Sequence, residues 1–170
     1  MVEVVWRPRG RLLITFYLMW KEVLHRPLLY LSYYFKRLRQ EYYDRLNLVR
    51  ENGDYEQWID FFLKGIIETS GYAVDTARRI LELQTRHRDL LWREKISSPL
   101  AVGILEKLYV TPYVAVRTIA ETFDISFQAA STLVLQLERV GILKEITGRK
   151  RDKRYVYTEY LNILSEGTKQ

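Results

Sequence analysis

The chain has 170 residues, of which 48% are hydrophobic and 28% charged, and this length suits one domain or two small ones. The balance excludes a largely disordered chain. Cysteine is absent, which excludes disulfides, thiolate metal sites and a cysteine nucleophile. With His25 and His87 as the two histidines, we expect no metal site. The formal net charge of +6 favours an anionic partner, and we expect a cytoplasmic protein.

The N-terminal segment has the outline of a signal peptide, because three arginines precede an apolar run over residues 12–20. No small-residue cleavage site follows, and Lys21-Glu22 closes the run too early for a membrane span. We therefore expect no membrane partner and a buried helix from about Gly10 to Leu24. This helix ends before Pro27, because the residue before a proline resists helical geometry.

A second helix is predicted from about Ser32 to Asn52, with Gly53 as its stop signal. Asp54 then reads as the N-cap of a third helix, and Gln57 three residues later completes a capping-box pattern. The third helix extends to about Glu94, either unbroken or divided near Gly71. Aromatic residues recur at helical spacing over these segments and are predicted to form a core. Residues 1–96 are therefore predicted to form a helical domain.

A different pattern begins at Pro99. We expect short helices around Leu100–Leu108, over Val116–Phe123 and over Phe127–Val140, the third capped by Ser126. A hairpin follows, with strands over residues 142–147 and 154–158 and a basic loop between them. This order predicts a winged helix-turn-helix domain over residues 97–170 with a two-stranded β-wing.

The polar and basic residues of this domain fit a DNA interface. A recognition helix presents short polar side chains near its N-terminus to base edges. The candidates here are Ser126, Gln128, Ala129, Ser131 and Thr132. Wing cations contact phosphates or enter the minor groove. The candidates here are Arg149, Lys150, Arg151, Lys153 and Arg154. Residues 144–154 hold six cations and two acids, a net charge of +4.

Two features favour protein contacts instead of DNA. The predicted recognition helix carries no lysine or arginine before Arg139, and Leu135, which we expect to be exposed, could serve a dimer contact. The alternative, a winged-helix domain that makes protein contacts and whose basic wing is merely solvated, therefore stays open.

The stretch GRLLITFYLMWKEVLHRPLLYLSYYFKRLRQEYYDRLNLVRENGDYEQWIDFFLKGI closely resembles the region that follows the active-site motif of Fic proteins. The resemblance continues through GILKEITGRKRDKRYVY, as in Fic proteins that carry a C-terminal winged domain, and covers about Gly10 to Leu164. It implies that residues 1–96 correspond to the C-terminal part of a Fic domain. The overall fold class is then mainly α: a helical bundle followed by the winged helix-turn-helix.

Fic enzymes transfer AMP from ATP to a target hydroxyl through the motif HxFx(D/E)GNGRxxR. The resemblance assigns Gly10 and Arg11 to the end of this motif, as residual Fic positions. Its GNGR segment would fall at Val5 to Pro8, which read Val-Trp-Arg-Pro, and its histidine would fall before Met1. We therefore expect no catalytic residue, no cofactor and no AMP transfer by this chain alone. We expect ATP and Mg²⁺ to bind only if a partner chain completes the Fic site.

Three functions remain open at this point. The first is a DNA-binding regulatory remnant of a Fic protein, active as a homodimer. The second is one half of a split AMP-transferase, completed by a separately encoded N-terminal Fic half. The third is a module for protein–protein interaction.

Overall fold

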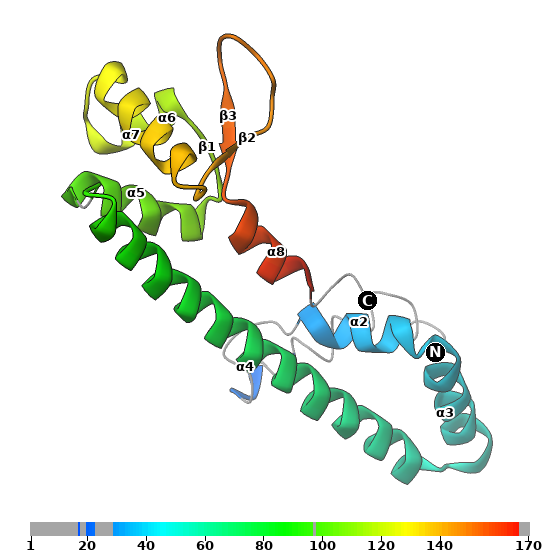
Figure 1. Ribbon diagram of the computed structural model, residues 1–170. Helices are drawn as coiled ribbons and strands as arrows, with labels where there is room; N and C mark the ends of the chain where they lie inside the picture. Colours follow the sequence, from blue (N-terminus) through cyan, green and yellow to red (C-terminus); the bar gives the residue numbers. More distant parts are fainter. Residues whose placement is uncertain (1–16, 18–19, 23–28, 97, 167–170) are drawn as a thin grey trace. The chain divides into compact units, whose positions relative to one another are not determined.

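The computed structural model describes residues 17, 20–22, 29–96 and 98–166 and is mainly helical, with one small antiparallel sheet (Figure 1). The predicted mainly α class is therefore confirmed. The predicted first helix, Gly10–Leu24, lies largely outside the described residues. None of the described helices is both long and apolar enough to cross a membrane. Two compact units, Met1–Asp75 and Thr76–Gln170, are each described separately below.

The first unit contains α2 (Leu29–Arg37), α3 (Arg39–Asn52) and the beginning of α4 (Tyr55–Arg93). The sequence predicted a single helix in place of α2 and α3. This is wrong, because Leu38 lies between them with φ −99° and ψ 41°, outside helical geometry. The predicted stop after α3 is confirmed. Gly53 adopts the left-handed conformation, with φ 67°, that a side chain would disfavour.

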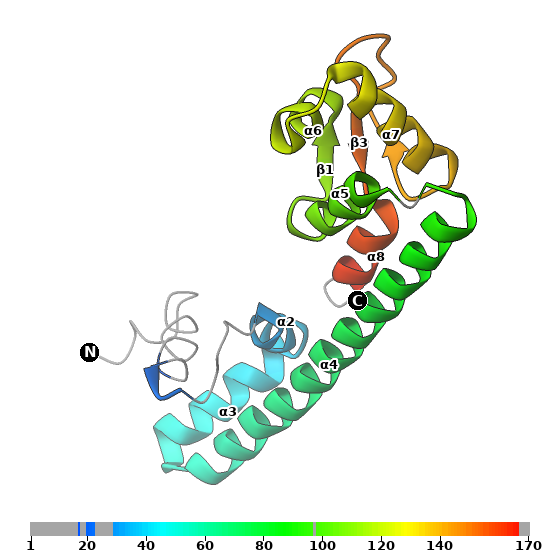
Figure 2. The ribbon, with the colours of Figure 1, turned by 90° about the vertical axis from the view of Figure 1, so that its left-hand side faces the viewer.

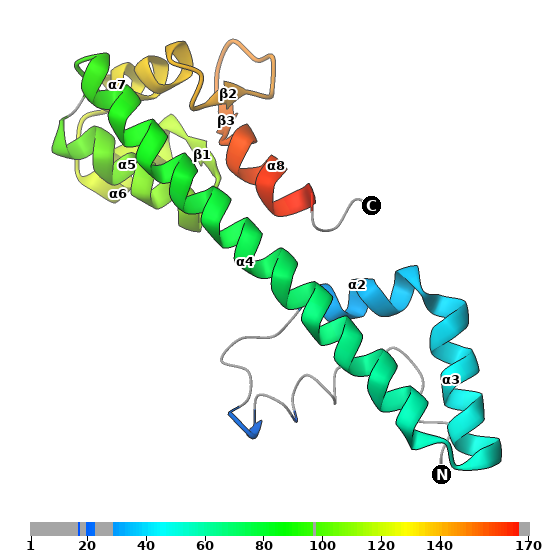
Figure 3. The same ribbon diagram turned by 60° about the horizontal axis from the view of Figure 1, so that its bottom comes forward.

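Aromatic side chains of α2, α3 and the start of α4 form one core. In Figures 2 and 3, α3 lies near the beginning of α4. Phe35 is 1% exposed and stacks on Phe61, with ring centroids 5.9 Å apart. Tyr34 and Tyr42 are also buried, which confirms that these aromatic residues belong to the core. Gly65 permits the close approach of α2 to α4, because a Cβ there would lie 2.8 Å from the Tyr34 ring.

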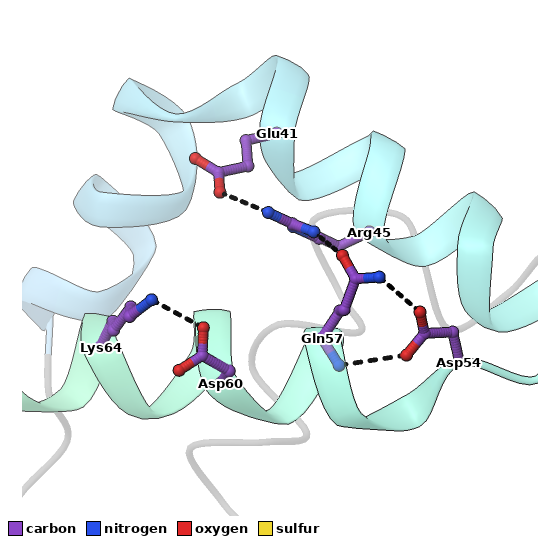
Figure 4. Close-up of polar contacts among 6 residues, drawn as sticks. All are labelled: Glu41, Arg45, Asp54, Gln57, Asp60 and Lys64. Atoms are coloured by element: carbon purple, nitrogen blue, oxygen red, sulfur yellow. Dashed lines mark hydrogen bonds and ion pairs between the residues drawn. The ribbon is translucent and has the colours of Figure 1, made fainter.

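The start of α4 is capped largely as predicted (Figure 4). The Gln57 backbone N–H donates to Asp54 Oδ1 at 3.2 Å. The second half of the predicted capping box differs, since Gln57 Nε2 donates to Asp54 Oδ2 at 2.6 Å. The Asp54 backbone N–H is instead directed to the Leu48 carbonyl oxygen. Gln57 Oε1 accepts from Arg45 Nη1, so the cap also links α3 to α4.

Helix α4 is a single helix of 39 residues, which confirms the unbroken alternative and shows that Gly71 does not divide it. The two compact units meet inside this helix, at Asp75 and Thr76. The sequence placed the domain boundary between residues 96 and 97. The difference has a packing reason, because Leu83 and Leu91 of α4 are buried in the core of the second unit.

The second unit continues from α4 with four further helices and three strands. They are α5 (Pro99–Val110), β1 (Tyr113–Ala115), α6 (Val116–Phe123), α7 (Phe127–Arg139), β2 (Lys144–Glu145), β3 (Arg154–Val156) and α8 (Thr158–Glu166). The three predicted helices of this region are present close to their predicted bounds. The sequence did not predict α8, because it extended the second hairpin strand to Thr158 and left the following residues unassigned.

The strand order is β1-β3-β2, with both pairs antiparallel (Figure 2). Val156 in β3 is paired with Tyr113 in β1 on one side and with Lys144 in β2 on the other. The predicted antiparallel hairpin is present as β2 and β3, with shorter strands, and β1 is a third strand that the sequence did not predict. Three residues are too few to display the alternation by which a strand is recognised, and β1 is held by pairing with a strand about 40 positions later in the sequence.

A buried network of polar side chains connects three helices of the second unit. His87 of α4 is hydrogen-bonded through Nδ1 to the Tyr157 hydroxyl at 2.6 Å, and Tyr109 of α5 approaches the same hydroxyl at 3.2 Å. The Tyr160 hydroxyl donates to the Tyr109 carbonyl oxygen at 3.0 Å. Burial raises the pKa of Tyr157 and lowers the pKa of His87, while Glu159 partly opposes the shift at His87. These contacts hold α4, α5 and α8 at the end of β3.

Candidate nucleic-acid interface

The start of α7 is fixed by a tight turn after α6. Asp124 ends α6 with φ 49°, and the Ile125 backbone N–H bonds to the Ala120 carbonyl oxygen at 3.0 Å. Ser126 then takes an extended conformation, and its Oγ accepts from the Ala129 backbone N–H at 3.2 Å. The predicted turn and cap are both confirmed. The remaining N–H groups of the first turn of α7 are therefore available to an anion.

The two faces of α7 differ in the way its sequence predicts. Ala130, Val134 and Leu137 are each 0% exposed and lie in the core of the second unit. The candidate base-contacting residues occupy the outer side. Four of them are exposed and one, Ser131, is half-buried: Ser126, Gln128, Ala129, Ser131 and Thr132. These side chains are therefore placed on the surface and not against the preceding helices.

The five candidates differ in how free their polar groups are. Thr132 Oγ1 already donates to the Gln128 carbonyl oxygen at 3.0 Å. Ser126 Oγ is used by the cap. The side-chain amide of Gln128 has no hydrogen-bond partner among the described residues, so it keeps its full capacity to read a base edge. Gln128 is therefore the strongest candidate for sequence readout.

Phe127 is a surface residue that the sequence analysis did not single out. It is 63% exposed and directly follows the Ser126 cap. The signal that could have identified Phe127 is a large aromatic residue at the first position of the predicted helix. Leu135 is 50% exposed, as predicted, although its role in a dimer stays a prediction.

The loop between β2 and β3 carries four of the five predicted cations and extends away from the strands (Figure 1), and the fifth, Arg154, is the first residue of β3. All five are exposed: Arg149, Lys150, Arg151, Lys153 and Arg154. Within the part of the chain that the structure describes, none of them forms an ion pair with an acidic side chain. The positive charge of the loop is therefore available to an external anion.

The acidic residue Glu145 shapes this loop. Its Oε1 accepts from the Thr147 backbone N–H at 2.7 Å and from the Thr147 hydroxyl, and the Gly148 N–H lies 3.0 Å away. These hydrogen bonds lower the pKa of Glu145, and the nearby positive charge of Lys153 makes the smallest contribution. Glu145 thus serves chiefly as the acceptor of the turn that leads into the loop.

The first turn of α7 and the β2–β3 loop lie at the same end of the second unit, away from α8 (Figures 1 and 2). A surface with exposed polar side chains, helix N–H groups and cations that form no ion pair with the described residues suits a polyanion. No group of three histidine, aspartate or glutamate side chains suited to a metal ion occurs among the described residues. The residual Fic positions, Gly10 and Arg11, lie outside them. No family model matches the chain.

Proposed function

We propose that the second unit contains a winged helix-turn-helix domain that binds DNA, and that the chain is a regulatory protein without AMP-transfer activity of its own. One observation carries this proposal: the exposed polar start of α7 lies at the same end of the unit as a cationic loop that forms no ion pair with any described residue.

The order of elements supports the winged-helix assignment. Helix α5 is followed by a short strand, then α6 and α7 with a tight turn between them, and finally a β-hairpin. The hairpin strand β3 pairs with β1, so the wing is attached to the helices through the sheet. Helix α7 occupies the place of the recognition helix in such a domain.

In this proposal α7 enters the major groove with its first two turns. The Gln128 side-chain amide pairs with an adenine, its nitrogen donating to N7 and its oxygen accepting from the N6 amino group, and the Ala129 methyl group contacts a thymine methyl group. The N–H groups at the start of α7 bind a phosphate. The cations of the β2–β3 loop neutralise backbone phosphates or enter the minor groove, which supplies affinity with little sequence information.

The test is direct binding to DNA by the full chain. Fluorescence anisotropy with a labelled random-sequence duplex should show binding at low salt that weakens steeply as KCl is raised. A selection from a random duplex pool should then yield a preferred sequence, since base contacts by α7 imply discrimination. Absence of binding at low salt would remove the proposal, and would leave protein–protein interaction as the function of this surface.

The Fic resemblance and the split AMP-transferase remain predictions, since no described residue bears on the missing catalytic motif. Incubation of the chain with labelled ATP and a separately encoded N-terminal Fic half would test the split AMP-transferase. The cytoplasmic location is likewise an expectation from the sequence.

A further inference from the structure

Helix α4 carries a row of exposed apolar side chains along one face. The exposed fractions are large for Ile59 (52%), Leu63 (51%), Ile67 (73%), Val74 (60%) and Leu81 (62%). Ser70 and Ala77 fill the remaining positions, so the row advances by three or four residues at every step. All seven belong to one continuous helix, and this spacing places them on a common face. None of the seven is charged, and the row extends over about 33 Å.

The row is nearly symmetric about Ser70. Ile59 and Leu81 lie eleven residues before and after Ser70, and Leu63 and Ala77 lie seven residues before and after it. Ile67 and Val74 lie three residues before and four after. A second copy of α4, antiparallel and related by a two-fold axis at Ser70, would therefore place each apolar residue of the row opposite another apolar residue, with Ser70 facing Ser70 at the axis. This is the self-complementary pattern of an isologous contact.

The charges of α4 select the same arrangement. Residues 55–75 contain four acids and one lysine, a net charge of −3. Residues 76–93 contain five arginines and two acids, a net charge of +3 when His87 is neutral. An antiparallel copy sets the acidic half against the basic half, whereas a parallel copy sets like charges against each other. Charge thus favours a second copy of this chain and fixes its direction.

The charged side chains beside the row fit this register. Asp60 and Arg78 are 18 residues apart, which is five full turns, so they flank the row on the same side. In the antiparallel pair, Asp60 would face Arg78 of the second copy, and Lys64 would face its Asp75. Asp60 now accepts from Lys64 at 2.7 Å within the helix (Figure 4), and Arg78 has no ion-pair partner among the described residues.

We infer that the chain forms a homodimer in which the exposed face of α4 packs antiparallel against the same face of a second copy, with the two-fold axis at Ser70. This inference rests on α4 and does not depend on nucleic-acid binding. A second copy also accounts for exposed leucine and isoleucine side chains that would otherwise remain in water.

Cross-linking tests the register, because the natural chain contains no cysteine. Ser70→Cys should give a disulfide-linked dimer under mild oxidation, since the two thiols would lie at the axis. Leu63→Cys is the matched control. Its two copies would be separated by 14 helical residues, about 21 Å, too far for a disulfide. A mixture of Leu63→Cys with Ala77→Cys should cross-link again. Equal cross-linking of Leu63→Cys and Ser70→Cys alone would overturn the antiparallel arrangement.

Sedimentation tests the dimer itself. The natural chain should be dimeric at roughly 100 µM, and Ile67→Glu should raise the dissociation constant a hundredfold or more, because each interface would bury two carboxylates. Val110→Glu makes a similar change at a 78% exposed position of α5 and should leave the dimer intact. Circular dichroism checks that both variants remain helical.

A monomeric natural chain would overturn the inference, and would point to residues 10–24 of the same chain as the cover of the row. The result is independent of DNA binding. If the nucleic-acid proposal fails, the natural chain should still be a dimer. If the dimer inference fails, DNA binding by the second unit remains to be measured with the same random-sequence duplex.

Discussion

Removal of three cations from the β2–β3 loop gives the sharpest prediction about DNA binding. Arg149, Lys150 and Arg151 are exposed and have no ion-pair partner among the described residues. Substitution of all three by alanine therefore removes charge without breaking an ion pair among the described residues. The formal net charge falls from +6 to +3, that is, 6 − 3. We expect the variant to fold normally and to bind every DNA sequence more weakly.

The magnitude follows from counterion release. Each phosphate contact contributes about −0.9 to the slope of log K against log salt concentration, so loss of three contacts reduces the steepness of the slope by about 2.7. Between 50 and 200 mM KCl, roughly a fourfold change, the affinity ratio of natural chain to variant should then fall by about 40-fold. The difference between the proteins is thus largest at low salt.

Fluorescence anisotropy with the same random duplex over this salt range measures both slopes. A matched control removes three other exposed cations, Lys36, Arg50 and Arg93, which gives the same net charge. If net charge alone governs binding, the control loses the same slope. If the loop contacts phosphates, the control keeps most of the natural slope. An unchanged slope in the loop variant would refute the assignment of these cations to the backbone of DNA.

Three further predictions concern single residues. Gln128→Ala should reduce discrimination at one base pair by about 1–3 kcal/mol, measured by competition with single-base variants of the preferred duplex. Leu137→Ala should lower the free energy of unfolding by about 2–5 kcal/mol in urea titration, because Leu137 is 0% exposed. Burial lowers the pKa of His87, so below about pH 6.5 the unfolded chain binds more protons than the folded chain, and stability should fall with decreasing pH.

Each of these predictions has a control. Gln128→Ala should leave the salt slope unchanged, and a change in slope with no change in preference would contradict base readout. Leu135→Ala truncates a half-exposed leucine of the same helix and should cost much less than Leu137→Ala. His87→Gln removes the titrating group, so its stability should depend less on pH between 7.5 and 5. Equal pH dependence in both proteins would assign the effect to other groups.

Local signals in the sequence predicted a large part of the second unit. The Ser126 cap, the turn at Asp124 and the spacing of Ala130, Val134 and Leu137 define α7 and its buried face, and each depends on neighbours within one or two turns. The same applies to Gly53 at the end of α3.

Elements that depend on distant partners were missed. Strand β1 is three residues long and exists through pairing with β3. The break at Leu38 separates two segments whose apolar positions continue the same helical spacing, so periodicity could not reveal it. The role of Glu145 as the acceptor of the turn, bonded to the backbone of Thr147 and Gly148, was not predicted from the sequence.

By itself, the sequence determined which residues are apolar, where most helices begin and end, and where positive charge accumulates, because caps, periodicity and composition act over short distances. Tertiary structure decided the rest. It assigned the second half of α4 to the core of the second unit, added β1 to the sheet and left the face of α4 with Ile67 and Val74 exposed. These outcomes depend on which surfaces meet after folding, and packing between distant segments leaves no local trace in the sequence.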